Sequence, residues 1–509
     1  MPPASNPFRK AFWPVRAPLA HAAITSLLLA VAAPFAHADN QAIAARDAQN
    51  KRWSQQTIEQ PKSQPPSLEA KYNHVITFGQ SLASAAEGWP ALSKQSGYDN
   101  LMLGDATRSA TFSGDRFVPV GGAAFKPLHA VVQLKRDPKV LLDAEAVAQL
   151  EKQAQEEGES VEVGALNMAR RLYLESKGIK ADPEHLLVAS NAATSGRSIA
   201  QLSKVGGTHE YRRVLQAMDQ ARQVALAEGA SYSFSALFWL QGEYDYAEVQ
   251  GGINDKATYK KMLRQLRNDL YEDTAKAIDQ KRMPAFISYQ TDAKTSVVDG
   301  SLDVGLAQWE LAQEEPNWYL AGPVYPYVDK GTHLSANGYR WFGQMLGKVF
   351  HQVVVEQRGW QPLSPLSATV EGREILMDFH VPHPPLAFSE PYLGHKAQMI
   401  ENYGFVITDD KGKVPVENIE AAADTVLRLV VGRDLVGIPT IRYASQATGG
   451  AGELHDSDPT VADANYEYLP DEGMPEEANI EALVGKPYPL YNWSIAFEIK
   501  PSKGHDSAR

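Results

Sequence analysis

The chain of 509 residues contains no cysteine. Disulfide bonds, thiolate metal sites and cysteine nucleophiles are therefore excluded. The sequence also has no His-Glu-x-x-His zinc signature and no glycine-rich phosphate loop after a strand. A metalloenzyme or a nucleotide-binding protein is therefore not indicated, and we expect neither a metal nor a cofactor.

Positive charge is scarce. There are 49 Lys and Arg residues against 61 Asp and Glu residues, which gives a net charge of −12. An acidic surface argues against nucleic acid or an anionic membrane as a partner. The content of 44% hydrophobic and 22% charged residues is ordinary for a soluble globular protein, and it does not indicate an oligomeric state.

Long apolar runs are missing except near the N-terminus. There a basic region, Arg9, Lys10 and Arg16, is followed by a mostly apolar stretch at residues 19–33 and by the small-x-small sequence Ala36-His-Ala38. This pattern predicts a signal peptide at residues 1–38, with an uncleaved anchor as the alternative. Its removal takes away three basic residues and no acidic ones, so the net charge becomes −15. We expect a bacterial protein that is exported to the periplasm or the medium, with no membrane span left.

The rest of the chain divides into three parts by its pattern. Residues 39–70 are polar and contain three prolines, which predicts a linker or an extended arm. Residues 71–356 alternate between strand-like and helix-like segments, which predicts a mostly parallel sheet covered by helices on both faces. The strands are expected at residues 74–78, 186–189, 234–240, 285–289 and 318–320. The helices are expected at residues 140–156 and 163–176, around 211–218 and 259–266, and at 336–354.

Residues 357–509 follow a different pattern, which predicts a smaller, β-rich and sandwich-like domain. Apolar residues alternate with others at 375–381, and strand-like runs follow at 425–431 and 495–499. The sequence at 409–412 is typical of a hairpin turn. Residues 453–481 are acidic and contain no Lys or Arg. We interpret them as a solvated loop, with a calcium site around Asp456, Asp458 and Asp463 as the alternative.

The segment Tyr72-Asn-His-Val-Ile-Thr-Phe-Gly-Gln-Ser-Leu82 reads as a strand that ends at Gly79 and places Ser81 at its exit. A serine in this position can expose its hydroxyl as a nucleophile. Because ligands bind at the carboxyl ends of parallel strands, Ser81 lies where a site is expected. An ordinary turn is the alternative.

Three further stretches follow strands in the same region. The small-residue loop at 189–199 contains Gly196, whose backbone N–H can face an oxyanion. The stretch Trp239-Leu-Gln-Gly-Glu-Tyr-Asp245 places Gln241 at the same sheet edge, where its amide can donate to the oxyanion. Its two acids, Glu243 and Asp245, can position the site.

The third stretch supplies a candidate base. His333 precedes a predicted helix that Ser335 can cap, and Asp329 lies four residues upstream. A histidine beside a carboxylate can act as a general base. A structural role for this histidine is the alternative.

Taken together, these stretches resemble the SGNH (GDSL-type) hydrolases. The closest likeness is to their carbohydrate-esterase branch, typified by sialate O-acetylesterases and acetylxylan esterases. The resemblance rests on Gly79-Gln80-Ser81, on Trp-x-Gln-Gly-Glu-x-Asp at residues 239–245, and on Asp329 to His333 before a helix. The family's Asp-x-x-His has two intervening residues, and this chain has three. Either the loop carries one extra residue or Asp329 does not pair with His333, and the alternative is then a Ser–His dyad helped by another acid. The resemblance implies a flavodoxin-like three-layer α/β/α fold at residues 71–356.

The resemblance also implies roles for these residues. Ser81 is the expected nucleophile and His333 the base, which Asp329 orients. The backbone N–H groups of Ser81 and Gly196, with the Gln241 amide, are expected to form the oxyanion hole. Gln80, Glu243 and Asp245 are expected to support the site.

The implied function is a secreted serine esterase that removes O-acetyl groups from a carbohydrate through an acyl-serine intermediate. The expected partner is an acetylated carbohydrate or a small ester. A general short-chain esterase, an arylesterase, a thioesterase or a lipase of the same fold is one alternative. Another is a non-catalytic glycan-binding protein that uses aromatic residues of the β-rich domain, such as Tyr488, Tyr491 and Trp493.

Overall fold

The computed structural model describes residues 40–247, 251–295 and 301–503. The predicted signal peptide lies outside these residues. Residues Gln41–Arg509 form one compact unit, and the predicted boundary between residues 356 and 357 stays a prediction. In the described part of the chain, no helix combines the length and the apolar composition that a bilayer crossing requires.

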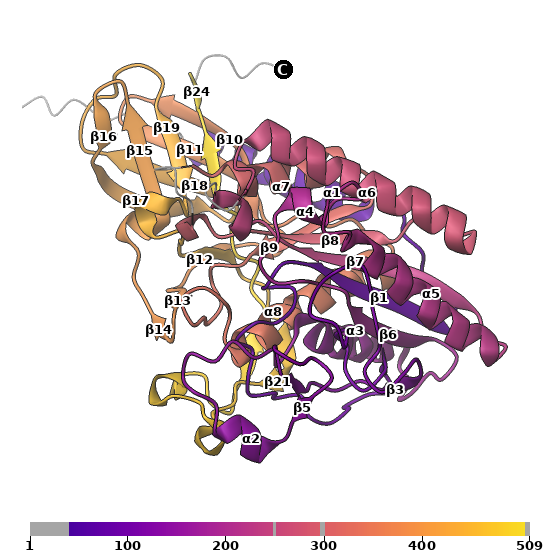
Figure 1. Ribbon diagram of the computed structural model, residues 1–509. Coiled ribbons are helices and arrows are strands. Elements are labelled where there is room, and N and C mark those ends of the chain that lie inside the picture. The colour runs from indigo at the N-terminus through magenta and orange to yellow at the C-terminus, as the bar shows by residue number, and fades with distance from the viewer. Residues whose placement is uncertain (1–39, 248–250, 296–300, 504–509) are drawn as a thin grey trace, which may run out of the picture. The chain divides into compact units, whose positions relative to one another are not determined.

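A seven-stranded sheet forms the centre of the first part, in the spatial order β3–β2–β6–β1–β7–β8–β9 (Figure 1). Its strands are β1 (Tyr72–Gly79), β2 (Leu101–Leu103), β3 (Phe125–Pro127), β6 (Leu186–Asn191), β7 (Tyr232–Leu240), β8 (Ala285–Gln290) and β9 (Trp318–Pro323). All neighbouring pairs are parallel except β2 with β3. If the five strands β6–β1–β7–β8–β9 are numbered by their order in the chain, their order in the sheet is 2-1-3-4-5, which is the flavodoxin-like order. The predicted parallel sheet is confirmed.

Helices cover both faces of this sheet. They are α3 (Val161–Lys177), α4 (Ile199–Leu202), α5 (Tyr211–Ala227), α6 (Lys256–Ile278), α7 (Asp303–Glu314) and α8 (Ala336–Phe350), whereas the short α2 (Ala144–Ala148) lies apart from the sheet. Along β7, Ala236, Phe238 and Leu240 pack in one core with α3 and α8, whereas Leu237 and Trp239 pack in another core with α5, α6 and α7. This alternation produces the three layers, because successive side chains of a strand point to opposite faces.

The predicted helix at residues 140–156 is wrong over most of its length. Leu141–Leu142 forms β5, which pairs with β4 (Val132–Gln133), and only α2 is helical. The carbonyl of Ala154 accepts a hydrogen bond from Trp89 Nε1 at 2.7 Å. The segment after α2 is therefore held by a tertiary contact that its local sequence does not reveal.

The C-terminal part is β-rich, as predicted, and its two larger sheets have the orders β17–β18–β11–β10–β24 and β16–β15–β19–β23. Strands β10 to β17 are Ser364–Glu371, Glu374–His380, Leu386–Phe388, Tyr392–Leu393, Lys396–Ala397, Phe405–Asp409, Gly412–Val414 and Val416–Ala423. Strands β18 to β24 are Val426–Val431, Thr440–Tyr443, Leu454–Asp456, Val461–Asn465, Pro487–Pro489, Phe497–Ile499 and Ser502–Lys503. Met377 of β11 and Ile407 of β15 belong to one core, so the two sheets pack together as a sandwich.

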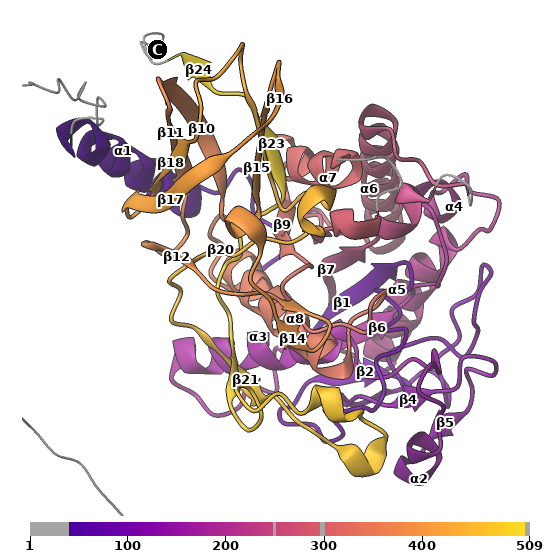
Figure 2. The ribbon, with the colours of Figure 1, turned by 90° about the vertical axis from the view of Figure 1, so that its left-hand side faces the viewer.

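The expected linker or arm at residues 39–70 contains a 20-residue helix, α1 (Asn40–Glu59). Figure 2 shows α1 beside β11 and β18. Arg46 donates two hydrogen bonds to the Asp378 carboxylate, at 3.0 and 2.7 Å, and Asn50 donates a third at 3.0 Å. Ser54 Oγ lies 2.9 Å from Nδ1 of the buried His380. Polar contacts to β11 therefore dock this helix.

Candidate active site

Ser81 follows β1 at the edge where β1 and β7 end. The two strands come so close at Gly79 (φ +149°) that a Cβ there would lie 2.0 Å from the carbonyl oxygen of Leu240. The next amide, that of Gln80, donates to the same carbonyl at 3.0 Å. Only glycine allows this passage, after which the chain turns and presents Ser81 at the carboxyl end of the sheet. In the 2-1-3-4-5 order, this edge between β1 and β7 is the ligand-binding position.

His333 lies against the serine. Its Nε2 is 2.8 Å from Ser81 Oγ, although 252 residues separate the two in the chain. The turn before α8 fixes the histidine, because Lys330 N donates to the His333 carbonyl at 2.7 Å and Ser335 Oγ caps the helix by accepting from Gly338 N at 3.2 Å. A hydroxyl and an imidazole at hydrogen-bond distance have the geometry of a nucleophile with its general base.

In place of the expected Asp329, the carboxylate that lies against His333 Nδ1 belongs to Glu87, whose Oε2 is 3.4 Å away. Asp329 uses its Oδ1 to accept from Gly331 N at 2.6 Å, and its Oδ2 lies 3.3 Å from Lys294 Nζ. The sequence separation of four residues placed Asp329 near His333 in the chain. The Asp329 side chain, however, closes its own turn and pairs with Lys294.

The backbone at Glu87 is in the left-handed region, with φ +64°. Glycine usually takes this conformation, and other residues are held there by their surroundings. The surroundings here are hydrogen bonds on both sides of Glu87. Tyr339 OH donates to the Ala86 carbonyl at 2.9 Å, and Glu159 N donates to the Gly88 carbonyl at 2.7 Å. The loop is thus fixed in the conformation that places the carboxylate at His333.

The expected oxyanion donors divide into two groups. The backbone N–H groups of Ser81 and Gly196 donate no hydrogen bond within the described part of the chain. Gly196 has φ +68°, and its loop is tied to the nucleophile turn through Ser195 Oγ, which lies 2.9 Å from Ser84 Oγ. These two N–H groups are free to donate to an oxyanion.

The Gln241 amide, by contrast, is already used inside the protein. It is completely buried, donates to the Arg197 carbonyl at 3.3 Å and to Asp245 Oδ2, and accepts from Tyr259 OH at 2.9 Å. Both of its amide hydrogens therefore have partners, so the structure does not place them on the oxyanion. Gln241 instead fixes the loop that carries Gly196.

The supporting residues hold the same loops. Gln80 Oε1 accepts from Gly242 N and Tyr244 N, each at 3.1 Å. Asp245 accepts from Ile199 N at 2.9 Å, and burial raises its pKa to about 6. Glu243 accepts from Tyr289 OH at 2.5 Å. These side chains join β1, the Gly196 loop and the 241–245 segment.

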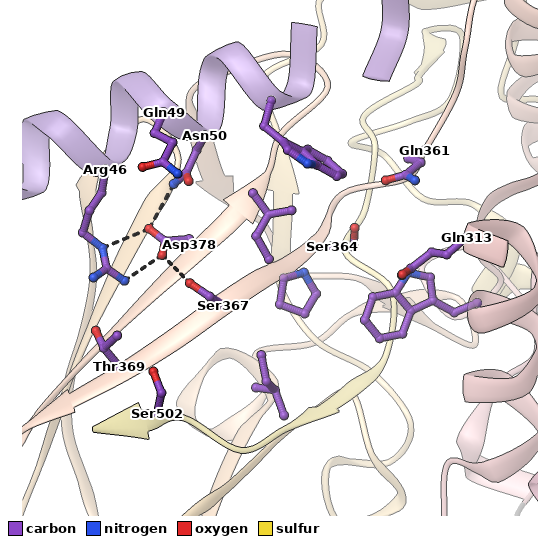
Figure 3. A pocket seen from close by; sticks show the side chains of 15 residues that line it. Arg46, Gln49, Asn50, Gln313, Gln361, Ser364, Ser367, Thr369, Asp378 and Ser502 are labelled. Carbon is purple, nitrogen blue, oxygen red and sulfur yellow. Dashed lines mark hydrogen bonds and ion pairs between the residues drawn. The ribbon is translucent and has the colours of Figure 1, made fainter. Parts of the chain in front are cut away.

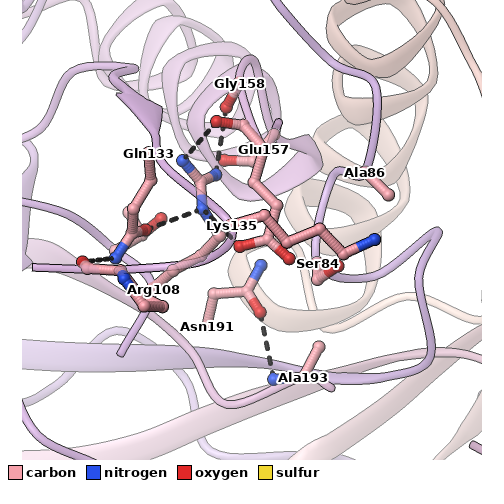
Figure 4. Close-up of polar contacts among 12 residues, drawn as sticks. Ser84, Ala86, Arg108, Gln133, Lys135, Glu157, Gly158, Asn191 and Ala193 are labelled. Atoms are coloured by element: carbon pink, nitrogen blue, oxygen red, sulfur yellow. Dashed lines mark hydrogen bonds and ion pairs between the residues drawn. The ribbon is translucent and has the colours of Figure 1, made fainter. Parts of the chain in front are cut away.

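Beneath the serine turn lies a buried polar network (Figure 4). Arg108 donates to Gln133 Oε1 at 3.1 Å and to the Gly158 carbonyl at 3.0 Å. Burial raises the pKa of Glu157, and Arg108, 3.6 Å away, opposes this shift. Asn191 Nδ2 donates to the Ala83 carbonyl at 2.7 Å, which anchors the turn two residues after the serine. The network makes this turn a rigid base for the nucleophile.

Two cavities lie near His333, and both are lined by Asp329. A small one, of about 20 Å³, is lined by His333 together with Leu82, Glu243, Asp292, Lys294, Val324, Tyr325, Asp329, Thr332 and Leu334. A cleft of about 690 Å³ begins at Glu87 and Asp329 and extends past Trp89, Lys330 and His395. Lys330 Nζ lies 4.2 Å from the centre of the Trp89 ring, and burial lowers its pKa to about 8. His333 itself lines the small cavity, whereas the large cleft is lined by Glu87, whose carboxylate lies against His333 Nδ1.

The acidic segment at residues 453–481 differs from the expected solvated loop, since Asp456 and Asp458 are buried. Lys348 Nζ lies 2.9 Å from Asp458 Oδ2. Although burial alone would raise the pKa of Asp458, the Lys348 ammonium and further hydrogen bonds hold it at about 2. Among the described residues, no group of three or more Asp, Glu or His side chains is arranged to hold a metal.

The aromatic residues considered for glycan binding are packing residues. Tyr488 is completely buried, Trp493 is 7% exposed, and the Tyr491 ring stacks on His455 with their centres 4.4 Å apart. Tyr488 and Trp493 therefore offer no open aromatic surface to a sugar, and Tyr491 is only partly exposed. The glycan-binding alternative loses two of the three side chains on which it rested.

Comparisons with known proteins give structural likenesses only. A carbohydrate acetylesterase from Xanthomonas citri is 12% identical over 84% of this chain and 80% of its own, with a TM-score of 0.48. NanS is 13% identical, with 57% of this chain and 98% of NanS covered and a TM-score of 0.36. A protein from Arabidopsis thaliana is 16% identical over 55% and 99%, with a TM-score of 0.36. No family model and no curated protein matches the sequence. The function is therefore inferred from this chain's own residues.

Proposed function

We propose that this chain is an exported serine esterase of the SGNH type that removes acetyl or similarly short acyl groups from a carbohydrate. The observation that carries the proposal is the 2.8 Å contact between Ser81 Oγ and His333 Nε2 at the ligand-binding edge of the sheet. The motif Trp-x-Gln-Gly-Glu-x-Asp at residues 239–245 supports the same family.

The residues suggest the following reaction. Ser81 Oγ attacks the carbonyl carbon of the ester while its proton passes to His333 Nε2. The backbone N–H groups of Ser81 and Gly196 donate to the oxyanion that forms. The tetrahedral intermediate collapses, the bond to the sugar oxygen breaks, and His333 returns the proton to that oxygen. An acyl-serine and a free sugar hydroxyl result.

The second half repeats these steps with water. His333 takes a proton from a water molecule, whose oxygen attacks the acyl-serine carbonyl. The bond to Ser81 Oγ then breaks, Ser81 recovers its proton from His333, and the carboxylic acid leaves. In both halves the imidazole becomes positively charged. We assign Glu87, 3.4 Å from Nδ1, the role of orienting and stabilising that charge.

The sizes of the two cavities support a short acyl group on a larger, polar alcohol. The space of about 20 Å³ against His333 has room for little more than one water-sized group. The cleft of about 690 Å³ combines polar side chains, such as Lys152, Gln153 and Glu477, with the apolar residues Trp89, Leu393 and Pro475. Such a mixed lining suits the hydroxyl groups and the C–H faces of a carbohydrate.

The test is acetate release by the purified protein from acetylated xylan and from an O-acetylated sialoside, with Ser81→Ala as the control. Release that is lost in the control supports the proposal and identifies the sugar class. Cleavage of p-nitrophenyl acetate without release from either carbohydrate would reject the carbohydrate part and leave a general short-chain esterase. Inactivity towards all three esters would reject the esterase itself.

A further inference from the structure

A second cleft, of about 830 Å³, lies where α1, β10 and α7 meet (Figure 3). Cavities of this size commonly bind small molecules. The described residues that line it are Arg46, Gln49, Asn50, Trp53, Trp309, Gln313, Gln361, Ser364, Pro365, Leu366, Ser367, Thr369, Asp378, Ile499 and Ser502. We call this cavity the α1 cleft.

The α1 cleft is separate from the catalytic pair. None of its lining residues lines either cavity beside His333. Gln313 lies in the last turn of α7, directly before β9, whose first residue is Trp318. This side of the cleft therefore adjoins the amino end of a parallel strand, whereas Ser81 follows the carboxyl end of β1.

The α1 cleft has no free charge. Its only charged lining residues in the described chain are Arg46 and Asp378, which bind each other through two hydrogen bonds. Figure 3 shows that Asn50 and Ser367 complete the contacts of the same carboxylate, at 3.0 and 2.6 Å. A charged ligand would find no unpaired counter-charge here, so the cleft suits a neutral one.

The rest of the lining combines aromatic rings with neutral polar groups. Trp53 is 38% exposed and Trp309 is partly exposed. The side-chain amides of Gln49, Gln313 and Gln361 take part in no hydrogen bond within the described part of the chain. Each amide can donate and accept, as a sugar hydroxyl does, and an indole ring offers a flat apolar surface to the C–H face of a pyranose.

We propose that the α1 cleft binds a neutral oligosaccharide and is a second carbohydrate site, apart from the one at Ser81. Trp53 and Trp309 contact the sugar rings, and the three glutamine amides bind the hydroxyl groups. A polymer held in the α1 cleft would keep the catalytic pair close to many ester groups, which raises their effective concentration. The inference goes beyond the proposed esterase and does not depend on catalysis.

The test uses the full chain with Ser81→Ala, so that no substrate is turned over. Isothermal titration calorimetry measures the binding of xylohexaose, cellohexaose and mannohexaose. We expect at least one to bind, and Trp53→Ala and Trp309→Ala each to weaken it by about tenfold or more. The matched control is Phe112→Ala, which removes a ring that is 40% exposed and does not line the cleft. The affinity of the Phe112→Ala variant for the same oligosaccharide should be unchanged.

A second variant covers the case in which loss of Trp53 disturbs α1, since its ring also contacts His380. The double change Gln49→Ala and Gln313→Ala removes only exposed, unbonded amides and should weaken binding several-fold. The inference is overturned if none of the three oligosaccharides binds at millimolar concentration, or if affinity survives all these changes. It is also overturned if hexagalacturonate binds more tightly than each neutral hexasaccharide.

The two proposals fail in different ways. In the chain that retains Ser81, Trp53→Ala and Trp309→Ala should leave the hydrolysis of p-nitrophenyl acetate unchanged, because this small ester needs no second site. Binding without hydrolysis would support the α1 cleft and reject the esterase. Hydrolysis without oligosaccharide binding would support the esterase and reject the α1 cleft as a carbohydrate site.

Discussion

Glu87 Oε2 lies 3.4 Å from His333 Nδ1, and the residue that carries this carboxylate has a left-handed backbone conformation. The carboxylate comes from the loop that follows Ser81 and not from the turn before His333. One loop therefore carries both the proposed nucleophile and the proposed acid. A change in that loop would move both groups relative to His333.

Glu87→Gln should lower kcat by about 100-fold or more with little change in KM, because it removes the charge that stabilises the imidazolium. Asp329→Asn should lower kcat by less than about tenfold, since its carboxylate serves its own turn and Lys294. Steady-state kinetics on p-nitrophenyl acetate measure both. A larger loss for Asp329→Asn than for Glu87→Gln would return the role of the acid to Asp329.

Gly79→Ala should lower the free energy of unfolding by at least about 3 kcal/mol, because its Cβ would lie 2.0 Å from the Leu240 oxygen. The matched control is Gly196→Ala. There the nearest atom, of Tyr244, is 3.9 Å from the added Cβ, and only the strain of φ +68° remains, at about 1 kcal/mol. Urea unfolding measures both variants. Equal losses would mean that the close approach of β1 to β7 is not what requires glycine.

The buried carboxyl of Asp245 should make stability depend on pH. Burial raises its pKa in the folded protein to about 6 from the ordinary 3.8 of an aspartate, so the folded state binds the proton more tightly than the unfolded state. The stabilisation that Asp245 contributes to the folded state is fully present below the pKa of this carboxyl in the unfolded chain. It is lost as the pH rises through about 6. Between about pH 3 and about pH 7, the stability of the wild type relative to Asp245→Asn should fall by about 2–3 kcal/mol. Urea unfolding across this range is the measurement, and parallel curves would contradict the prediction.

Asp378→Ala should release α1. The change removes the carboxylate that accepts from Arg46 and leaves Asn50 only its contacts with Thr425, and loss of such a part-buried charged contact costs about 2–4 kcal/mol. Hydrogen exchange in residues 46–54 should rise. The control is Lys51→Ala, which removes only exposed ion pairs and should cost less than about 1 kcal/mol. Unchanged exchange in Asp378→Ala would show that α1 is held by other contacts.

The sequence predicts the parallel sheet well because the signals are local. Each of the longer strands after β1 is a short apolar run followed by a helix, and the order of such units restricts the topology to a few forms. The pairing of Ser81 with His333 could also be expected, since both follow recognisable motifs at the same sheet edge.

Helix α1 could not be expected from the same signals. Its buried residues are Ile43, Asn50 and Ser54, which lie on one face, but two of the three are polar. Hydrophobic periodicity is therefore weak, and the partners of these residues lie more than 300 positions away in the chain. A polar helix of this kind is stabilised by tertiary contacts and not by a pattern in its own sequence.

The proposed acid, Glu87, could not be found in the sequence for a related reason. Glu87 lies in an irregular loop, and the position of its side chain depends on a positive φ. A glycine would signal such a backbone conformation in the sequence, but a glutamate does not. Asp329 had the stronger signal because it is near His333 in the sequence. Nearness in the chain did not decide the contact, since an Asp side chain readily bonds to the backbone two residues on.

The docking of α1 on β11 also has a consequence for the order of events during synthesis. Arg46 is made 332 residues before Asp378, its partner. At about 5–20 residues per second, α1 must wait on the order of 15–70 seconds before that strand exists. The first helix of the described chain therefore has no strand to dock on until most of the chain has been made.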